Sequence, residues 1–160
     1  MQNGYEREFT YVYGAVSPLE GGFDYRLCEK MNTEHMGGFL RQVSGKYADE
    51  YILMVVDGAS SHKAKALEVP ANVARIALPS YCLHQNKKMG RLSPLRSGSP
   101  QLNPQENVWD EIRGKNFPNR VYASMAAVRG QLTAGLETFA NSPASATSLT
   151  AWPWIRSILS

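Results

Sequence analysis

The sequence has few cysteines and no long hydrophobic run. Its two cysteines, Cys28 and Cys82, are too few for a disulfide framework and lack the spacing of metal ligands. No apolar run approaches the roughly 18 residues that a membrane-spanning helix needs. The first residues have neither the basic nor the apolar region of a secretory signal. These absences predict a cytoplasmic protein with no membrane partner.

A strong excess of positive charge is also missing. The 160 residues carry a net charge of +3, from 17 Lys and Arg against 14 Asp and Glu. Four of the basic residues, however, fall in the acid-free segment Cys82–Gly98, and without them the basic residues no longer outnumber the acidic ones. The overall charge therefore does not indicate DNA binding, although the local basic segment leaves that reading open.

Strand patterns and helix patterns alternate along the chain, and its length fits one domain. We expect a hairpin of strands at 9–16 and 23–28, a helix from residue 32 with Thr33 as its cap, a strand at 51–56, a short helix near 63–67, a strand at 73–78, and helices from 104 to about 113 and from 124 to about 140. The continuously apolar run at 51–56 predicts a strand that is covered on both faces. Residues 142–150 have the pattern of a loop, and residues 149–155 that of a short aromatic segment that packs back. This order predicts an α/β domain with a mixed sheet and helices on both faces.

Asp57 stands where an α/β fold often binds ligands. It follows the apolar residues Ile52–Val56 and precedes a small-residue loop that ends at His62. The carboxyl end of a strand is the usual ligand edge of such a sheet. An aspartate that only caps the next turn would have the same pattern. His62 could orient a carboxylate or contact a phosphate, and it could equally be a surface residue.

Glu106 lies at the predicted start of a helix. Asn103 as the N-cap, Pro104 at the first helical position and Glu106 three residues after the cap resemble a capping box. In the structural reading, Glu106 only bonds back to the cap. Together with Asp57, however, it offers a second rigidly held carboxylate, and carboxylate oxygens are the ligands that Mg²⁺ prefers. The pair therefore predicts a metal site made by Asp57 and Glu106.

The remaining polar residues near these acids favour structural roles. Trp109, one turn after Glu106, is predicted to anchor the helix in the core. Asp110 and Glu111 are predicted to be solvated. Scattered basic residues could contact phosphates or form a solvated face; they are Arg113, Lys115, Arg120 and Arg129. The serines at 60 and 61 have no Gly-x-Ser-x-Gly setting, which argues against a serine hydrolase.

Three segments, Tyr51–Lys63, Ile76–Tyr81 and Ser99–Trp109, resemble the DDE-superfamily endonuclease domain of mariner-like bacterial insertion-sequence transposases. The likeness runs from about Phe9 to Ile155, and its most specific element is Leu-Asn-Pro-x-Glu-x-x-Trp after a strand-end aspartate.

The resemblance implies a ribonuclease-H-like fold, a mixed sheet flanked by helices, in which three acids bind two Mg²⁺ or Mn²⁺ ions. It implies that water is activated to cut transposon ends and that the freed 3′-hydroxyl then attacks target DNA. By position, Asp57 would be the second acid and Glu106 the third, each a metal ligand. The implied partners are DNA and a second copy of the chain, in the nucleoid-associated part of a bacterial cytoplasm.

Two departures from the family pattern qualify these expectations. The family's first acid precedes the strand at 9–16, and neither Glu6, Glu8 nor Asp24 stands in a matching context. The family's amino-terminal helix-turn-helix region is also absent. We therefore expect one partial domain over residues 1–160, truncated at the amino end by a broken or split reading frame. Such a chain should be inactive alone, unless a separate amino-terminal fragment supplies the first acid.

The second departure is Cys82–Gly98, which separates two elements that adjoin in the family. We expect a disordered surface insertion, which costs little loop-closure entropy, with a DNA-contacting loop as the alternative. For the whole chain, the competing reading is a non-catalytic nucleic-acid-binding or assembly remnant of a transposase.

Overall fold

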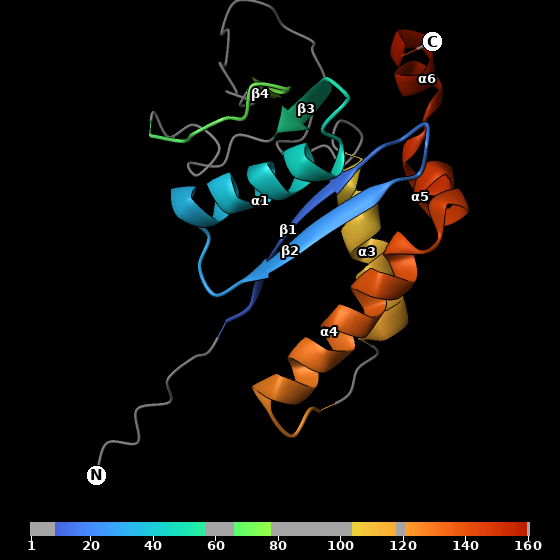
Figure 1. Cartoon of the computed structure of the whole chain (residues 1–160). Coiled ribbons are helices and arrows are strands. Elements are labelled where there is room, and N and C mark those ends of the chain that lie inside the picture. Colours follow the sequence, from blue (N-terminus) through green and yellow to red (C-terminus); the bar gives the residue numbers. More distant parts are fainter. Residues whose placement is uncertain (1–8, 57–65, 78–103, 118–120, 160) are drawn as a thin grey trace, which may run out of the picture.

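The described part of the chain begins with a β-hairpin (Figure 1). The computed structural model describes residues 9–56, 66–77, 104–117 and 121–159. Strands β1 (Tyr11–Val16) and β2 (Phe23–Cys28) pair antiparallel, with Tyr11 opposite Cys28 and Val16 opposite Phe23. Gly21 closes the connection with a φ of 73°, a value that favours glycine. The predicted hairpin is therefore confirmed.

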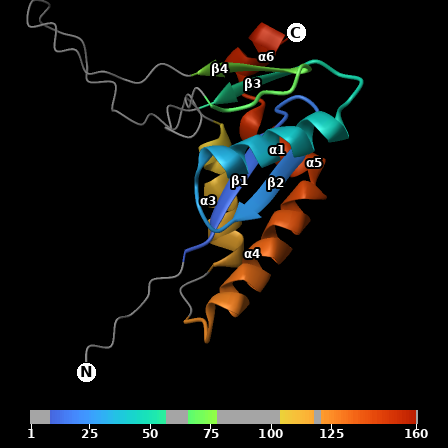
Figure 2. The same cartoon turned by 60° about the vertical axis from the view of Figure 1, so that its left-hand side comes forward.

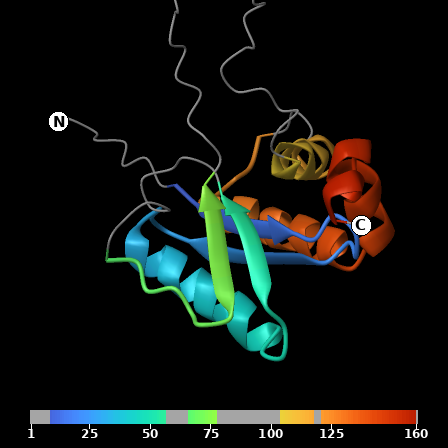
Figure 3. The ribbon, with the colours of Figure 1, turned by 90° about the horizontal axis from the view of Figure 1, so that it is seen from above.

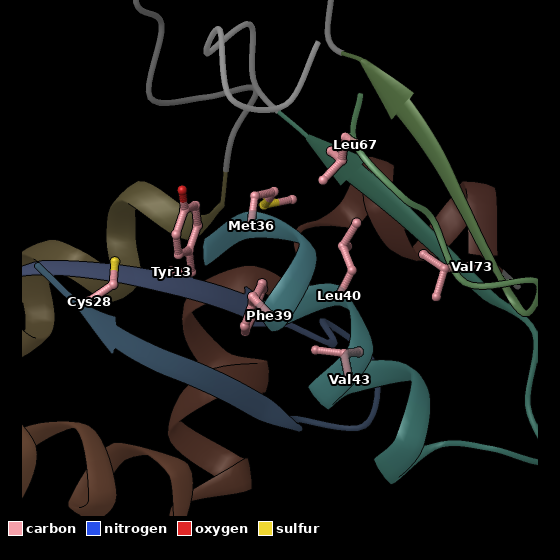
Figure 4. Close-up of a cluster of buried hydrophobic side chains, with 8 residues drawn as sticks. All are labelled: Tyr13, Cys28, Met36, Phe39, Leu40, Val43, Leu67 and Val73. Carbon is pink, nitrogen blue, oxygen red and sulfur yellow. The ribbon is translucent and has the colours of Figure 1, made fainter. Parts of the chain in front are cut away.

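Helix α1 (Thr33–Lys46) follows the hairpin and packs across it. The cap is Asn32 and not Thr33 as predicted, because the Asn32 side chain accepts a hydrogen bond from the His35 backbone N–H. Met36, Phe39, Leu40 and Val43 recur at spacings of three and four and form the buried apolar stripe of α1. Figure 4 shows it within a buried cluster that contains Tyr13, Cys28, Met36, Phe39, Leu40, Val43, Leu67 and Val73.

Strands β3 (Ile52–Val56) and β4 (Val73–Ala77) pair parallel, as a second two-stranded sheet. Ile52 and Met54 pack on the α1 cluster, whereas the side chains of Leu53 and Val55 are 57% and 58% exposed. The prediction that β3 is covered on both faces is thus wrong for the described residues. Helix α1 covers one face of this small sheet, and no described element buries the other, so the strand alternates between buried and exposed positions.

The carboxyl-terminal part is helical: α3 (Gln105–Asn116), α4 (Met125–Ala140), α5 (Pro143–Thr150) and α6 (Pro153–Leu159). Ser124 caps α4, which begins where the sequence predicts a helix from residue 124. Two predictions for this part are wrong. Helix α3 continues through Gly114 to Asn116, whose side chain donates to the Ile112 carbonyl at 3.0 Å and packs onto Gly135 of α4. Residues 143–150 form α5 and not a loop, since Pro143 suits a first helical position and Ala146 is fully buried.

The hairpin is the middle layer of the described fold (Figures 1 and 2). The α1 cluster covers one of its faces, and a second cluster from α3, α4 and α5 covers the other. The α/β class with helices on both faces of the hairpin is confirmed, but the described strands form two small sheets and not one mixed sheet. Most of the predicted helix at 63–67 and the whole of Cys82–Gly98 lie outside the described residues, whereas Leu67 is buried. Within the described parts, no helix has the length and apolarity to cross a membrane.

Candidate metal centre

Asp57 is the residue after β3 and lies outside the described residues. The strand that leads to it is well anchored. Its first backbone N–H, that of Ile52, donates to the Asn72 carbonyl at 2.7 Å. The Asn72 side chain then ties this corner to the end of α1: its amide Nδ2 donates to the Tyr47 carbonyl at 3.1 Å, and its Oδ1 accepts from the Ser44 hydroxyl at 2.6 Å. Sequence reasoning missed Asn72, whose position just before an apolar strand was the available signal.

Glu106 lies in the first turn of α3, and its side chain is exposed. The structure places Pro104 at the N-cap and shows no side-chain cap bond there, so Asn103 is not the N-cap that the sequence predicted. Asn103 itself lies outside the described residues. No hydrogen bond or ion pair joins Glu106 to any other residue of the described part. The structural reading, in which Glu106 bonds back to Asn103, therefore depends on a residue outside the described part.

Helix α3 itself is firmly held, which fixes the backbone that carries Glu106. Val108 is fully buried and Ile112 nearly so. The Asn107 amide donates to the Leu149 carbonyl at 3.1 Å and thereby joins α3 to α5. A carboxylate on such a helix has little freedom beyond its own side-chain rotamers.

Trp109 anchors α3 against the hairpin, as predicted. Its ring meets Phe23 edge-on, with 6.1 Å between the ring centroids. It also lies directly on Gly14 of β1: a Cβ atom there would stand 2.6 Å from the Trp109 ring and 3.0 Å from the Gln105 amide. Gly14 therefore permits the close approach of α3 to β1, a role that sequence reasoning missed although a glycine within a strand was its signal.

The remaining charges on α3 form a solvated face with internal ion pairs. Asp110 accepts from Arg113 at 3.0 Å, and both side chains are mostly exposed. Glu111 pairs with Lys115 one turn later and is more buried than the solvated position predicted for it. These pairs favour the solvated-face reading of Arg113 and Lys115 over phosphate contact. Arg129 donates to the Thr10 hydroxyl at 2.8 Å, and Arg120 and the residues 60–62 lie outside the described part.

Asp24 is committed to a structural cluster between the hairpin and α1. Its side chain is 12% exposed, and its two oxygens accept from Lys46 at 2.6 Å and from Tyr47 at 2.9 Å. The hydrogen bond to Asp24 raises the pKa of Lys46, and burial raises the pKa of Tyr47. With both oxygens bonded in this way, Asp24 is unsuited to be a metal ligand.

Glu106 has the chemistry that a divalent cation needs. Its carboxylate is exposed and unpaired among the described residues, and oxygen donors of this kind suit Mg²⁺ and Mn²⁺. Figures 1 and 2 both show the carboxyl end of β3 and the amino end of α3 at the same end of the molecule. Within the described ranges, no three His, Cys, Asp or Glu side chains gather as a metal-binding group. Among the described residues, the fit to a divalent cation therefore rests on Glu106 and on the end of β3, which precedes Asp57.

This chain is similar to a curated protein and to a family of endonucleases. The chain is 28% identical over 116 residues to the uncharacterized protein y4pE/y4sA of Sinorhizobium fredii (strain NBRC 101917 / NGR234), a match that covers 71% of this chain and 73% of that protein. No solved structure matches the chain. The sequence profile of the DDE superfamily endonuclease family matches residues 2–129, which include both predicted acids and every described strand. The chain therefore belongs to the DDE superfamily of endonucleases, as the resemblance predicted.

Proposed function

We propose that this chain is the catalytic-domain part of a DNA transposase, in which Asp57 and Glu106 are metal ligands. The observation that carries the proposal is the position of Glu106: an exposed carboxylate, with no partner among the described residues, on a helix that is buried and bonded on its other side. Asp57 would be the second ligand, because it follows an anchored strand.

Mg²⁺ or Mn²⁺, when bound, would activate water and stabilise the leaving oxygen of a DNA phosphodiester. The residues of the chain would hold the ions and the DNA and would not act as nucleophiles. The family indicates DNA as the substrate and divalent metals as its cofactors. Beyond the family assignment, we propose that the chain has a ribonuclease-H-like fold and a two-metal site. We also propose that it comes from an insertion sequence and acts as a nucleoid-associated cytoplasmic enzyme.

Metal titration of the full chain tests the site. Mn²⁺ binding is followed by calorimetry for the parent chain and for Asp57→Asn and Glu106→Gln. We expect each substitution to weaken Mn²⁺ binding at least tenfold, because each removes a charged oxygen ligand. Asp110→Asn is the matched control: its carboxylate lies on the same helix, is exposed and already pairs with Arg113. Unchanged affinity in both test variants would refute the site.

We also propose that residues 1–160 form one partial domain and that Cys82–Gly98 is an insertion in it. The first acid would come from a separate amino-terminal transposase fragment, and the working assembly would contain two copies of the chain. The chain alone should then leave supercoiled DNA uncut with Mg²⁺ or Mn²⁺. Cleavage by the isolated chain that Glu106→Gln abolishes would contradict the missing acid but support the site. The alternative, a non-catalytic DNA-binding remnant, predicts salt-sensitive DNA binding with no metal dependence.

A further inference from the structure

Strand β1 is covered on both faces, and the described strands pair with it at one edge. Tyr11, Tyr13 and Ala15 pack in the α1 cluster, whereas Val12 and Val16 pack in the cluster of α3, α4 and α5. A strand with both faces covered by helices is normally an inner strand with two neighbours. Among the described residues, however, β2 is the single hydrogen-bonded neighbour of β1. Within the described part of the chain, β1 therefore has the surroundings of an inner strand but lacks a strand beside its second edge.

The hydrogen-bond register shows which groups face that edge. The Ser17 N–H donates to the Gly22 carbonyl at 2.7 Å, which makes this a hydrogen-bonded pair of the hairpin. Because such pairs alternate along an antiparallel ladder, the N–H and C=O groups of Val12, Gly14 and Val16 point away from β2. An edge of this kind can accept another strand.

The outer edge of β2, unlike that of β1, is partly covered by α1. There the Tyr25 carbonyl accepts a hydrogen bond from the Gln42 side chain at 2.9 Å, so α1 covers part of that edge. No backbone group of the described residues bonds to the outer edge of β1. Of the two edges of the hairpin, the edge of β1 is therefore the one that is suited to a further strand.

The surroundings of this edge favour a single extended segment. Helix α1 reaches beyond β1, because its cluster also contains Leu67 and Val73 of the β3–β4 unit (Figure 4). Figure 3 shows the β3–β4 pair running across the direction of the hairpin strands. A second copy of the chain would bring its own β1 with helices on both faces, and those helices would have to fit beside the helices that already flank this β1. A lone strand brings no such layers.

We propose that a segment of another polypeptide adds to the outer edge of β1 as a strand of about six residues, matching the six residues of β1. Because helices flank both faces of β1, the segment should be apolar on both faces. The parts of this chain outside the described residues contain no such segment: their longest apolar run is Tyr81–Leu83. This inference deepens the proposed function, since a separate fragment was proposed there, but strand addition needs no metal ligand.

Amide hydrogen exchange on the ¹⁵N-labelled full chain, without metal, tests the strand addition. The probe is a synthetic peptide of three Val-Ile repeats between pairs of lysines. We expect the amides of Val12, Gly14 and Val16 to exchange at least tenfold more slowly when the peptide is saturating. The amides of Tyr25 and Leu27, on the outer edge of β2, are the internal control and should keep their rates.

The same peptide with every strand residue N-methylated keeps the side chains but loses the donors, and it should not slow exchange. Three results would overturn the proposal: no slowing at Val12, Gly14 and Val16, equal slowing on the edge of β2, or strong protection of the β1 edge in the free chain. The last result would show that a segment of this chain already occupies the edge. Because no metal is present, each result is separate from the outcome of the metal titration.

Discussion

Replacing Gly14 by alanine tests whether the contact between β1 and α3 fixes the helix that carries Glu106. A Cβ atom at this position would stand 2.6 and 2.8 Å from two carbons of the Trp109 ring. Ordinary carbon–carbon contacts lie at about 3.5–4.0 Å, so the ring would have to move by roughly 1 Å. Trp109 is only half-buried and can shift, but the Gln105 amide at 3.0 Å limits the available space.

The expected cost follows from two opposing effects. Overpacking by one methyl group typically destabilises a core by about 1–3 kcal/mol. Alanine in a strand is favoured over glycine by roughly 0.5–1 kcal/mol, which offsets part of that cost. We therefore expect Gly14→Ala to lower the free energy of unfolding by about 1–2 kcal/mol.

Urea denaturation followed by Trp fluorescence measures the change. The matched control is Gly114→Ala in α3, where nothing lies within 4 Å of an added Cβ, and it should stabilise the chain by about 0.5–1 kcal/mol. In a double-mutant cycle with Trp109→Leu, read by circular dichroism, Gly14→Ala should cost less than it does in the parent chain. The same cost with and without the Trp109 ring would refute the proposed packing.

Two further predictions concern the end of α1. Asn72→Ala should lower the free energy of unfolding by about 2–3 kcal/mol, because it removes hydrogen bonds to several groups between Ser44 and β3. Asn72→Asp keeps the acceptor for Ser44 and is the comparison variant, and urea denaturation measures both. Lys46 and Tyr47 both have raised pKa values in the folded chain, so the folded state holds their protons longer and the urea midpoint should fall as the pH rises above about 10. Asp24→Asn should reduce that fall, and an equal fall in this variant would contradict the proposed cluster.

Local patterns were enough to predict most of the elements. The hairpin, the helix from residue 32 and the helix from residue 124 each depend on residues close together in the sequence, and each is confirmed. The errors arose where tertiary packing overrides local preference. Gly114 lowers helix propensity, but the helix continues because Asn116 packs onto Gly135 of α4. The apolar run of β3 suggested burial on both faces, although the pattern cannot show how many layers cover a strand.

The candidate site could be predicted only as residue types at element ends. Asp57 after an apolar run and Glu106 after Pro104 were recognisable, because strand ends and helix starts leave local signals. The residues that hold those elements could not be recognised in the sequence. Asn72 and Gly14 act through contacts with residues of α1 and α3 that are distant from them in the sequence.

The two acid-bearing elements are attached to opposite faces of the same hairpin. Helix α3 contacts β1 through Trp109 on one face, and β3 packs with α1 on the other. If Asp57 and Glu106 share a metal ion, the distance between them depends on how rigidly β1 is held. A strand added at the outer edge of β1 would stiffen β1 and both attachments together. Strand addition and metal affinity should therefore be coupled: saturating peptide should tighten Mn²⁺ binding in the parent chain and have no such effect in Glu106→Gln.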